Sequence, residues 1–294
     1  MAGGLKEVRE RITSVNSTQQ ITKAMKMVSA AKLKKASDSI LQMRPYTLKL
    51  QEMLGNVLGS LGEGEDLGNL SFAQVREPNN VLIVLVTSDR GLCGAFNSNL
   101  IKKAKALIED KYASKTISLM TIGKKGFDAF KAEAIDIDDR FITLFSDLSF
   151  DNSRTASEYI MQTYLDGKYD VIEVVFGEFK NAAVQYIKAE QFLPVVMEKP
   201  EQKSAKHFQA DYIFEPQKQA LLEKLVPKIL KTQFHRYLLD NNASEHGARM
   251  MAMDQATENA NELKRELKIS YNRARQAAIT TEISEIVSGA AALG

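Results

Sequence analysis

Cysteine is nearly absent from this sequence, and two long stretches contain neither glycine nor proline. The single cysteine, Cys93, excludes an intramolecular disulfide and is typical of a reducing compartment. Residues 5–44 and 248–288 are the stretches that lack both helix-breaking residues. A helix of about 40 residues is roughly 60 Å long, so each stretch predicts a helix longer than a compact domain is wide.

Long apolar runs are missing as well. Neither stretch contains about 18 consecutive apolar residues, so neither is expected to span a membrane. The opening MAGGLKEVRERI has no apolar segment, and we expect no secretory signal. With 294 residues, of which 44% are apolar and 26% charged, the composition is that of an ordinary globular protein of one or two domains.

The N-terminal stretch combines a coiled-coil pattern with charge of one sign. Its apolar residues follow a heptad spacing, slip near Thr18 and resume at Ile21. No acidic residue lies between Glu10 and Asp38, where Arg11 and five lysines occur. The helix therefore presents either a solvated basic face or a surface for an acidic protein partner. Nucleic-acid binding is less favoured, because no aromatic residue that could stack on a base occurs before residue 46.

The middle of the chain changes to strand patterns. Residues 81–87 form a continuous apolar, β-branched run, which is typical of a buried parallel strand. Further strands are expected at 116–122, 141–145, 171–179 and 184–192, and helices at 98–110, from 124 onward and at 153–165. Lys180 and Asn181 separate the last two strands and predict a hairpin. The expected fold class is α/β with long helices: a central Rossmann-like domain joined to an antiparallel coiled coil of the two terminal helices.

These patterns divide the chain into five segments. We expect an N-terminal shaft helix at 1–58, a linker at 59–77, the central α/β domain at 78–200, a linker at 201–215 and a C-terminal shaft helix at 216–294. Arg44-Pro45-Tyr46 is expected to end the first long helix, although the helical pattern continues beyond it. Pro227 is expected to kink or restart the last helix.

The loop Ser88–Asn97 (SDRGLCGAFN) leads from the first strand into a helix, the position at which nucleotide-binding folds hold phosphates. It contains neither GxGxxG nor GxxxxGK[ST], so a phosphate-binding enzyme is not favoured. We expect Gly91 and Gly94 to permit a tight strand-to-helix turn, and Gly123 and Gly126 to permit a similar one.

No other constellation indicates catalysis. The histidines at 207, 235 and 246 are not spaced as a metal-ligand set. Cys93 is expected to be a buried structural thiol despite nearby Arg90. The aspartates of IDIDDR, at 136, 138 and 139, are expected to form a solvated loop. No catalytic residue, cofactor or metal is therefore expected.

The C-terminal stretch changes character along its length. Leu230, Phe234 and Tyr237 open a seam with coiled-coil spacing, and small or polar residues follow them. The end becomes apolar again at regularly spaced positions, which include Ile279, Ile283, Ile286 and Leu293. A bare coil would leave this stripe in water, so we expect it to enter a hydrophobic socket.

Four segments carry motifs that occur together in one protein family. They are residues 21–32 (ITKAMKMVSAAK), 88–97 (SDRGLCGAFN), 244–260 (SEHGARMMAMDQATENA) and 271–293 (YNRARQAAITTEISEIVSGAAAL). In this order they resemble the gamma subunit family of F-type ATP synthases, in the bacterial form. A chance likeness between coiled coils would not reproduce the central loop. Residues 59–78 carry no such motif.

The resemblance implies a central rotor stalk that is itself not an enzyme. In that family the terminal helices pass through the hexamer of alpha and beta subunits, and the globular part sits on the membrane c ring beside epsilon. Rotation of the ring couples proton flow to ATP synthesis or hydrolysis in the hexamer. The expected partners are therefore the alpha and beta subunits, epsilon and the c ring, with no nucleic acid. The expected location is peripheral, on the cytoplasmic side of the cell (inner) membrane.

The resemblance also implies roles for individual residues. The positions that match a beta-subunit contact are Met25, Lys26, Arg275 and Gln276. The positions that match a hydrophobic bearing are Ile279, Ile283, Ile286 and Leu293. The positions that match a c-ring and epsilon contact are Arg44, Tyr46, Tyr212 and Glu215.

Two alternatives belong to other functional classes. A coiled-coil adaptor built on a degenerate nucleotide-binding domain would also combine long helices with an α/β domain that lacks a phosphate loop. A small α/β enzyme with helical arms is the third interpretation, and measurable nucleotide affinity of the isolated chain would favour it.

Overall fold

The computed structural model describes residues 2–59, 71–195 and 218–291. It contains two compact units: unit 1 comprises residues 1–30 and 249–294, and unit 2 comprises residues 31–248. Two long helices, α1 (Ala2–Gly59) and α5 (Lys218–Ala291), contribute to both units. Three residues with expected contacts, Tyr212, Glu215 and Leu293, lie outside the described residues.

Unit 2 is built around a five-stranded sheet in the order β3-β2-β1-β4-β5. Its strands are β1 (Asn80–Val86), β2 (Thr116–Ile122), β3 (Asp136–Asp138), β4 (Val171–Phe179) and β5 (Gln185–Leu193). The first four strands are parallel, and β5 pairs antiparallel with β4. The predicted α/β class with one hairpin is therefore confirmed. The chain changes direction across the sheet between β1 and β4, as in doubly wound folds.

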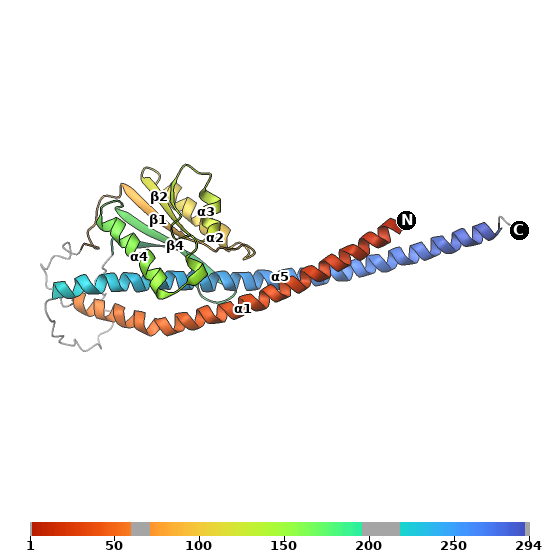
Figure 1. Cartoon of the computed structure of the whole chain (residues 1–294), viewed down its shortest axis with the longest axis horizontal. Helices are drawn as coiled ribbons and strands as arrows, with labels where there is room; N and C mark the ends of the chain where they lie inside the picture. The colour runs from red at the N-terminus through yellow and green to blue at the C-terminus, as the bar shows by residue number, and fades with distance from the viewer. Residues whose placement is uncertain (1, 60–70, 196–217, 292–294) are drawn as a thin grey trace. The chain divides into compact units, whose positions relative to one another are not determined.

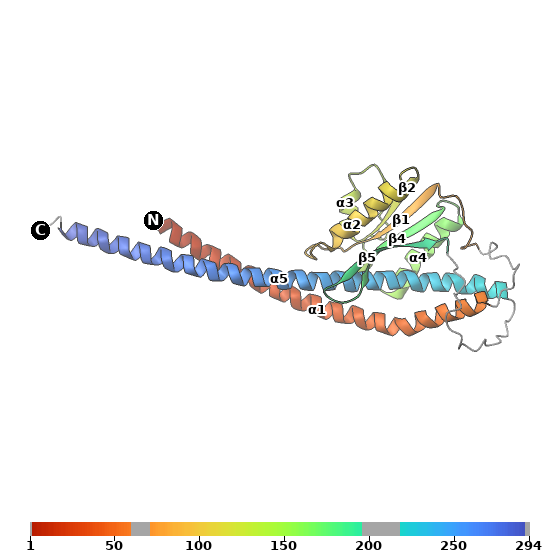
Figure 2. The same cartoon turned by 180° about the vertical axis from the view of Figure 1, so that it is seen from behind.

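Helices cover both faces of the sheet (Figure 1). α2 (Phe96–Ala106) and α3 (Lys124–Phe130) pack on one face, and α4 (Phe150–Leu165) and α5 pack on the other. Within unit 2, α5 lies between the sheet and α1 in both views (Figures 1 and 2). Because both faces are covered, β1 is apolar and buried along nearly its whole length.

The seam predicted at the beginning of α5 faces the sheet. Leu230, Phe234 and Tyr237 are at most 2% exposed and belong to the same core as β4. The ring of Tyr237 lies 4.3 Å from that of Phe176, measured between centroids. The interpretation of these residues as part of a coiled-coil seam was wrong, because their spacing marks a buried helix face without indicating what covers it.

Gly177 of β4 is where the sheet and α5 are joined by polar groups. Its N–H donates to Asn241 Oδ1 at 3.0 Å, and its carbonyl accepts from the Ser244 hydroxyl at 3.0 Å. A Cβ at this position would lie 2.6 Å from a ring carbon of Phe96 in α2 and 3.3 Å from the Cβ of Ser244 in α5. A glycine is therefore required here, because side chains of both helices approach this backbone closely.

Neither interior proline ends its helix. α1 continues through Pro45 to Gly59, so the expected helix end at Arg44-Pro45-Tyr46 was wrong, and α5 is continuous through Pro227. Pro45 lacks the N–H that would bond the carbonyl of Leu41. Both residues are exposed, so water can satisfy that carbonyl.

Two local predictions in unit 2 were also wrong. Residues 141–145, expected as a strand, form a turn that leads into the short 3-10 helix η3 (Leu144–Asp147). Residues 136, 138 and 139 were expected in a solvated loop, but the first two belong to the edge strand β3. In this strand Asp136 pairs with Ser118 of β2. Ile137 of this strand packs against the core, and Asp138 accepts a hydrogen bond from the Tyr159 hydroxyl of α4 at 2.9 Å.

Unit 1 is a pair of antiparallel helix segments from α1 and α5. Arg9 donates to the Tyr271 hydroxyl at 3.1 Å, and Lys26 binds Asp254 at 2.5 Å. Residue numbers rise along α1 as they fall along α5, which defines the antiparallel direction. This confirms the coiled coil expected for the two ends of the chain. Over residues 2–59, 71–195 and 218–291, no helix has the length and apolar content needed to cross a membrane.

Candidate functional site

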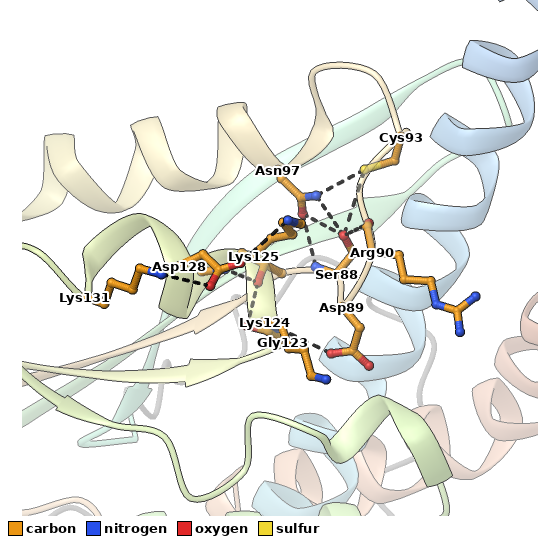
Figure 3. A network of polar contacts seen from close by, with 12 residues as sticks. Ser88, Asp89, Arg90, Cys93, Asn97, Gly123, Lys124, Lys125, Asp128 and Lys131 are labelled. Carbon is orange, nitrogen blue, oxygen red and sulfur yellow. Dashed lines mark hydrogen bonds and ion pairs between the residues drawn. The ribbon is translucent and has the colours of Figure 1, made fainter.

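The loop after β1 is held in place by its own side chains (Figure 3). The Ser88 N–H donates to Asn97 Oδ1 at 3.1 Å, and the Asn97 amide donates back to the Ser88 hydroxyl at 2.7 Å. Cys93 is 1% exposed and accepts from the same amide at 3.2 Å. In a phosphate loop the backbone N–H groups would face the ligand, whereas here the Ser88 N–H is bound to a side chain of the same loop. The arrangement is that of a structural turn with a buried thiol.

The backbone of this turn differs from the expectation at one residue. Gly94 has a φ of 60°, as a tight turn requires, but the second left-handed residue is Leu92, with a φ of 62°, and not Gly91. Gly123, with a φ of 95°, follows β2, and a Cβ there would lie 2.3 Å from the carbonyl oxygen of Thr87. The ends of β1 and β2 therefore approach each other so closely at Gly123 that only glycine fits there.

The expected beta-subunit contact includes a residue that already has a partner in this chain. Lys26 forms an ion pair with Asp254 of α5 at 2.5 Å, and its side chain is 40% exposed. Met25 is half-buried in the same segment of α1. Arg275 and Gln276, expected to share this contact, are both exposed on α5.

The apolar stripe at the end of α5 lies on the surface of unit 1. Ile279, Ile283 and Ile286 are 47%, 55% and 66% exposed. The N-terminal segment of α1 adds two apolar side chains of similar exposure, Ile21 at 59% and Val28 at 58%. Large apolar side chains in water at this density are typical of a surface that a partner covers.

Two of the residues expected to contact the c ring and epsilon, Arg44 and Tyr46, lie inside helix α1. Arg44 is exposed, and Tyr46 is 45% exposed with the Lys228 ammonium 6.0 Å from its ring centroid. This distance is at the outer limit of a cation–π contact between α1 and α5. Both residues lie in unit 2, on the same helix segment as Leu41 and Leu48, which are also exposed.

A buried glutamate in the sheet was not anticipated. Glu173 is 2% exposed in β4, and its carboxylate accepts from the Lys111 ammonium and, at 2.6 Å, from the Tyr112 hydroxyl. Burial, together with this hydrogen bond, raises the pKa of Tyr112 to about 12. Both donors follow α2 through the π-helical turn η2 (Leu107–Lys111). The sequence signal that could have identified this buried glutamate is its position inside the apolar run VIEVVF.

A second buried charge lies on α5. Asp240 is 8% exposed, and burial raises its pKa to about 6, although Arg236 at 3.8 Å opposes this shift. Two further carboxylates, Glu178 and Glu190 on the β4–β5 hairpin, also raise the pKa of Asp240. Lys188 forms ion pairs with both of them, at 2.9 and 3.8 Å. This cluster joins α5 to the edge of the sheet.

The histidines do not form a common site in the described structure. His235 is 9% exposed, and its Nδ1 lies 2.8 Å from the Ser153 hydroxyl of α4. Burial lowers the pKa of His235. His207 lies outside the described residues. Over the described ranges, no group of three or more histidine, cysteine, aspartate or glutamate side chains is arranged to hold a metal ion.

Comparison with known sequences gives matches along the whole chain. The ATP-synt family, described as ATP synthase, matches residues 4–293. The ATP synthase gamma chain of Cytophaga hutchinsonii is 55% identical over 293 residues, which cover 98% of each chain. The ATP synthase gamma chain of Flavobacterium johnsoniae is 51% identical over 289 residues, again covering 98% of each chain.

Solved structures show the same fold. A chain of the Euglena gracilis mitochondrial ATP synthase, in the cryo-EM structure of OSCP/F1/c-ring in rotational state 3, matches with a TM-score of 0.67 and 19% identity. The match covers 100% of the present chain and 95% of that chain. A chain in the rotor of the same enzyme in rotational state 1 matches with a TM-score of 0.62 and 19% identity, covering 95% and 100%.

Proposed function

The chain belongs to the family of ATP synthase gamma chains and is a central stalk subunit, and we propose that its helix pair carries torque between the membrane c ring and the hexamer of alpha and beta subunits. Neither the coiled-coil adaptor nor the α/β enzyme is needed to explain this chain. In this proposal the hexamer carries out ATP synthesis and hydrolysis, and the present chain supplies no catalytic residue. Epsilon and the c ring bind the globular part of the chain, and the complex holds the chain peripherally on the cytoplasmic side of the cell membrane.

The observation that carries the proposal is the outer surface of unit 1. Apolar side chains that are about half exposed occur on both of its helices, and the part of α1 that follows Glu10 in this unit, residues 11–30, has no acidic residue. Two helices alone cannot bury such a surface, because each has only one face toward the other. An apolar socket around the end of α5 and acidic loops around the basic segment would complement it.

Within this surface we propose that Met25, Lys26, Arg275 and Gln276 contact a beta subunit. Arg275 is the most informative member, because it is exposed and because no acidic residue occurs between Leu267 and Thr281 to pair with it along the helix. An arginine without a local acidic neighbour is suited to a carboxylate on another chain. Lys26 already forms an ion pair with Asp254 of this chain, so we expect it to contribute less than Arg275 to the beta-subunit contact.

Replacement of Arg275 by alanine tests the contact. We expect ATP turnover of the assembled complex to fall by about tenfold or more, because a hydrogen bond to a charged group contributes about 1.5–3 kcal/mol. The isolated chain should unfold at the same urea concentration as the wild type. Arg273→Ala, at an arginine two positions away that is also exposed, is the matched control. Equal turnover of Arg275→Ala and wild-type complexes would refute the assignment.

We propose that Arg44 and Tyr46, together with Tyr212 and Glu215, meet the c ring and epsilon. A charge of each sign and two amphipathic rings suit a polar interface that transmits torque. A cysteine at position 44 should form cross-links with loops of the c ring or of epsilon in the assembled enzyme. Cross-links to alpha or beta subunits alone would place this segment at the wrong end of the stalk.

A further inference from the structure

The two helices of unit 1 meet along a seam that is poor in large apolar side chains. Within the described part of this unit, the buried apolar residues are Met253 and Ala260, and buried polar residues include Thr22 and Ser29. A seam of small side chains accepts more than one alignment, because sliding one helix by a heptad again places similar residues opposite each other. Apolar burial alone therefore does not select one register.

Besides the hydrogen bond from Arg9 to Tyr271, three polar pairs lie close together along this seam, and we call these three the polar ladder. The Gln19 amide donates to Asn261 Oδ1, the Thr257 and Thr22 hydroxyls lie 2.8 Å apart, and the Lys26 ammonium binds the Asp254 carboxylate at 2.5 Å. The hydroxyl of Thr22 donates to the carbonyl of Gln19 at 3.0 Å and can accept from Thr257, whose single proton is shared with the carbonyl of Met253 at 2.7 Å. From the first pair to the last, each helix advances by seven residues, so all three pairs fit one alignment.

A shift of one heptad would break every pair at once. In one direction Thr22 would face Lys264 and Lys26 would face Asn261. In the other direction Thr22 would face Met250, and its hydroxyl, which is 8% exposed, would lose its donor. Both shifts separate Lys26 from Asp254. The shifted alignments offer substitute pairs, Lys26 with Asn261 in one direction and Gln19 with Asp254 in the other, but only the native alignment pairs Lys26 with an opposite charge. Polar groups that one alignment satisfies best are a usual means by which coiled coils specify register.

We propose that the polar ladder is a positioning device that fixes the axial register of α1 against α5 in unit 1. The inference rests on the proposed stalk function in one respect: a change of register would move Met25 relative to Arg275 and so alter the surface that the hexamer meets. Gln19, Thr22 and Lys26, with their partners, are positioning residues of the stalk. In this role the Lys26 ammonium binds the carboxylate of Asp254 in the same chain.

Cysteine pairs in the full-length chain can report the register directly. Ile12 lies ten residues before Thr22, and Leu267 lies ten residues after Thr257, so a disulfide between positions 12 and 267 reports the native alignment. Pairs of position 12 with 260 and with 274 report shifts of one heptad in either direction. All of these positions are half-buried or buried. Cys93, which is 1% exposed, is retained in every variant.

The ladder is removed by the triple variant Thr22→Val, Lys26→Met and Asn261→Leu. With the native ladder, the yield of the 12–267 disulfide should exceed that of either shifted pair by about tenfold. In the triple variant we expect this preference to fall to about twofold or less, while helix content measured by circular dichroism is retained. Lys23→Met, which removes an exposed lysine three residues from Lys26, is the control and should keep the native preference.

Two results would overturn the proposal. An unchanged preference for the 12–267 disulfide in the triple variant would mean that other contacts choose the register. Loss of all three disulfides together with loss of helix content would mean that the ladder is needed for the two helices to associate, and that it does not merely fix their register.

Charge reversal supplies an independent test that does not depend on the triple variant. Lys26→Asp places two carboxylates together and should reduce the native disulfide, and the added change Asp254→Lys should restore it. Failure of this rescue contradicts the positioning role. The same variants in the assembled complex separate the register from the stalk function: a shifted register with unchanged ATP-driven proton pumping would refute the functional consequence alone.

Discussion

In unit 2, α5 buries Phe234 and Tyr237 completely against a sheet, whereas in unit 1 the buried apolar residues of the same helix are Met253 and Ala260. Full burial of a large apolar side chain contributes about 1.5–3 kcal/mol, and unit 2 has many such residues on both faces of its sheet. Unit 1 has few, and polar pairs join its helices instead.

This difference indicates where each unit obtains its order. Unit 2 is held by a packed interior, so its structure is fixed by its own sequence. In unit 1 most of the larger apolar side chains are exposed, and apart from Met253 the buried residues are small or polar, so apolar burial contributes little to holding its helix pair together. A stalk that must turn inside other subunits needs an alignment that persists and a surface that remains available to its partners.

The largest expected effect tests the contrast within α5. Phe234→Ala should reduce the free energy of unfolding of unit 2 by about 3–5 kcal/mol, because it leaves a cavity in the core beside Phe192. Met253→Ala should reduce the free energy of unfolding of unit 2 by less than about 0.5 kcal/mol, since Met253 lies in unit 1. Urea unfolding of the full-length chain, followed by near-ultraviolet circular dichroism of the buried tyrosines, measures both. Equal shifts in the two variants would contradict the separation of the units.

The next effect tests whether the charge cluster beside the core opposes folding at neutral pH. The pKa of Asp240 is raised to about 6 in the folded state, so the folded chain binds this proton more tightly than the unfolded chain. Its contribution to stability is greatest below about pH 4 and is lost as the pH rises to about 6. Asp240→Asn, which cannot ionise, should therefore stabilise the chain by about 1–3 kcal/mol at pH 7.5.

Below about pH 4 the protonated aspartic acid and the asparagine are alike, and the two chains should have nearly equal stability. Urea midpoints measured at both pH values check this difference. The control is Asp166→Asn, a replacement at an exposed carboxylate on the C-terminal side of α4. A stability difference for Asp240→Asn that is the same at both pH values would show that its ionisation is not involved.

The sequence predicts the elements of unit 2 better than it predicts their partners. Val81–Thr87 indicates a buried parallel strand because strands covered on both faces are apolar throughout. Leu230, Phe234 and Tyr237 have a spacing that marks one face of a helix, and a sheet covers that face as well as a helix would. Periodicity identifies the buried face and does not identify the neighbour.

Polar contacts are harder still to predict. The partners of Lys26 and Thr22 are more than 200 residues away in sequence, and only the register of the two helices brings them together. The helix that continues through Pro45 depends on exposure of the carbonyl at Leu41, which local sequence does not specify. The expected contacts of Arg275 and Gln276 came from family motifs, and they remain predictions about surfaces that the isolated chain leaves exposed.

The smallest expected effect on the isolated chain is at the end of α5. Ile283 is 55% exposed, so Ile283→Ala should change the free energy of unfolding by no more than about 0.5 kcal/mol. In the assembled complex the same side chain is proposed to lie in an apolar socket, where its loss should weaken binding to the hexamer by about 1–2 kcal/mol. Unfolding of the chain alone and titration of the chain into alpha–beta hexamers measure the two values. Glu282→Ala, at the neighbouring exposed position, is the matched control and should change neither value appreciably. If Ile283→Ala leaves hexamer affinity unchanged, the apolar stripe does not act as the bearing, and the contrast between a self-contained unit 2 and a partner-dependent unit 1 loses its main functional support.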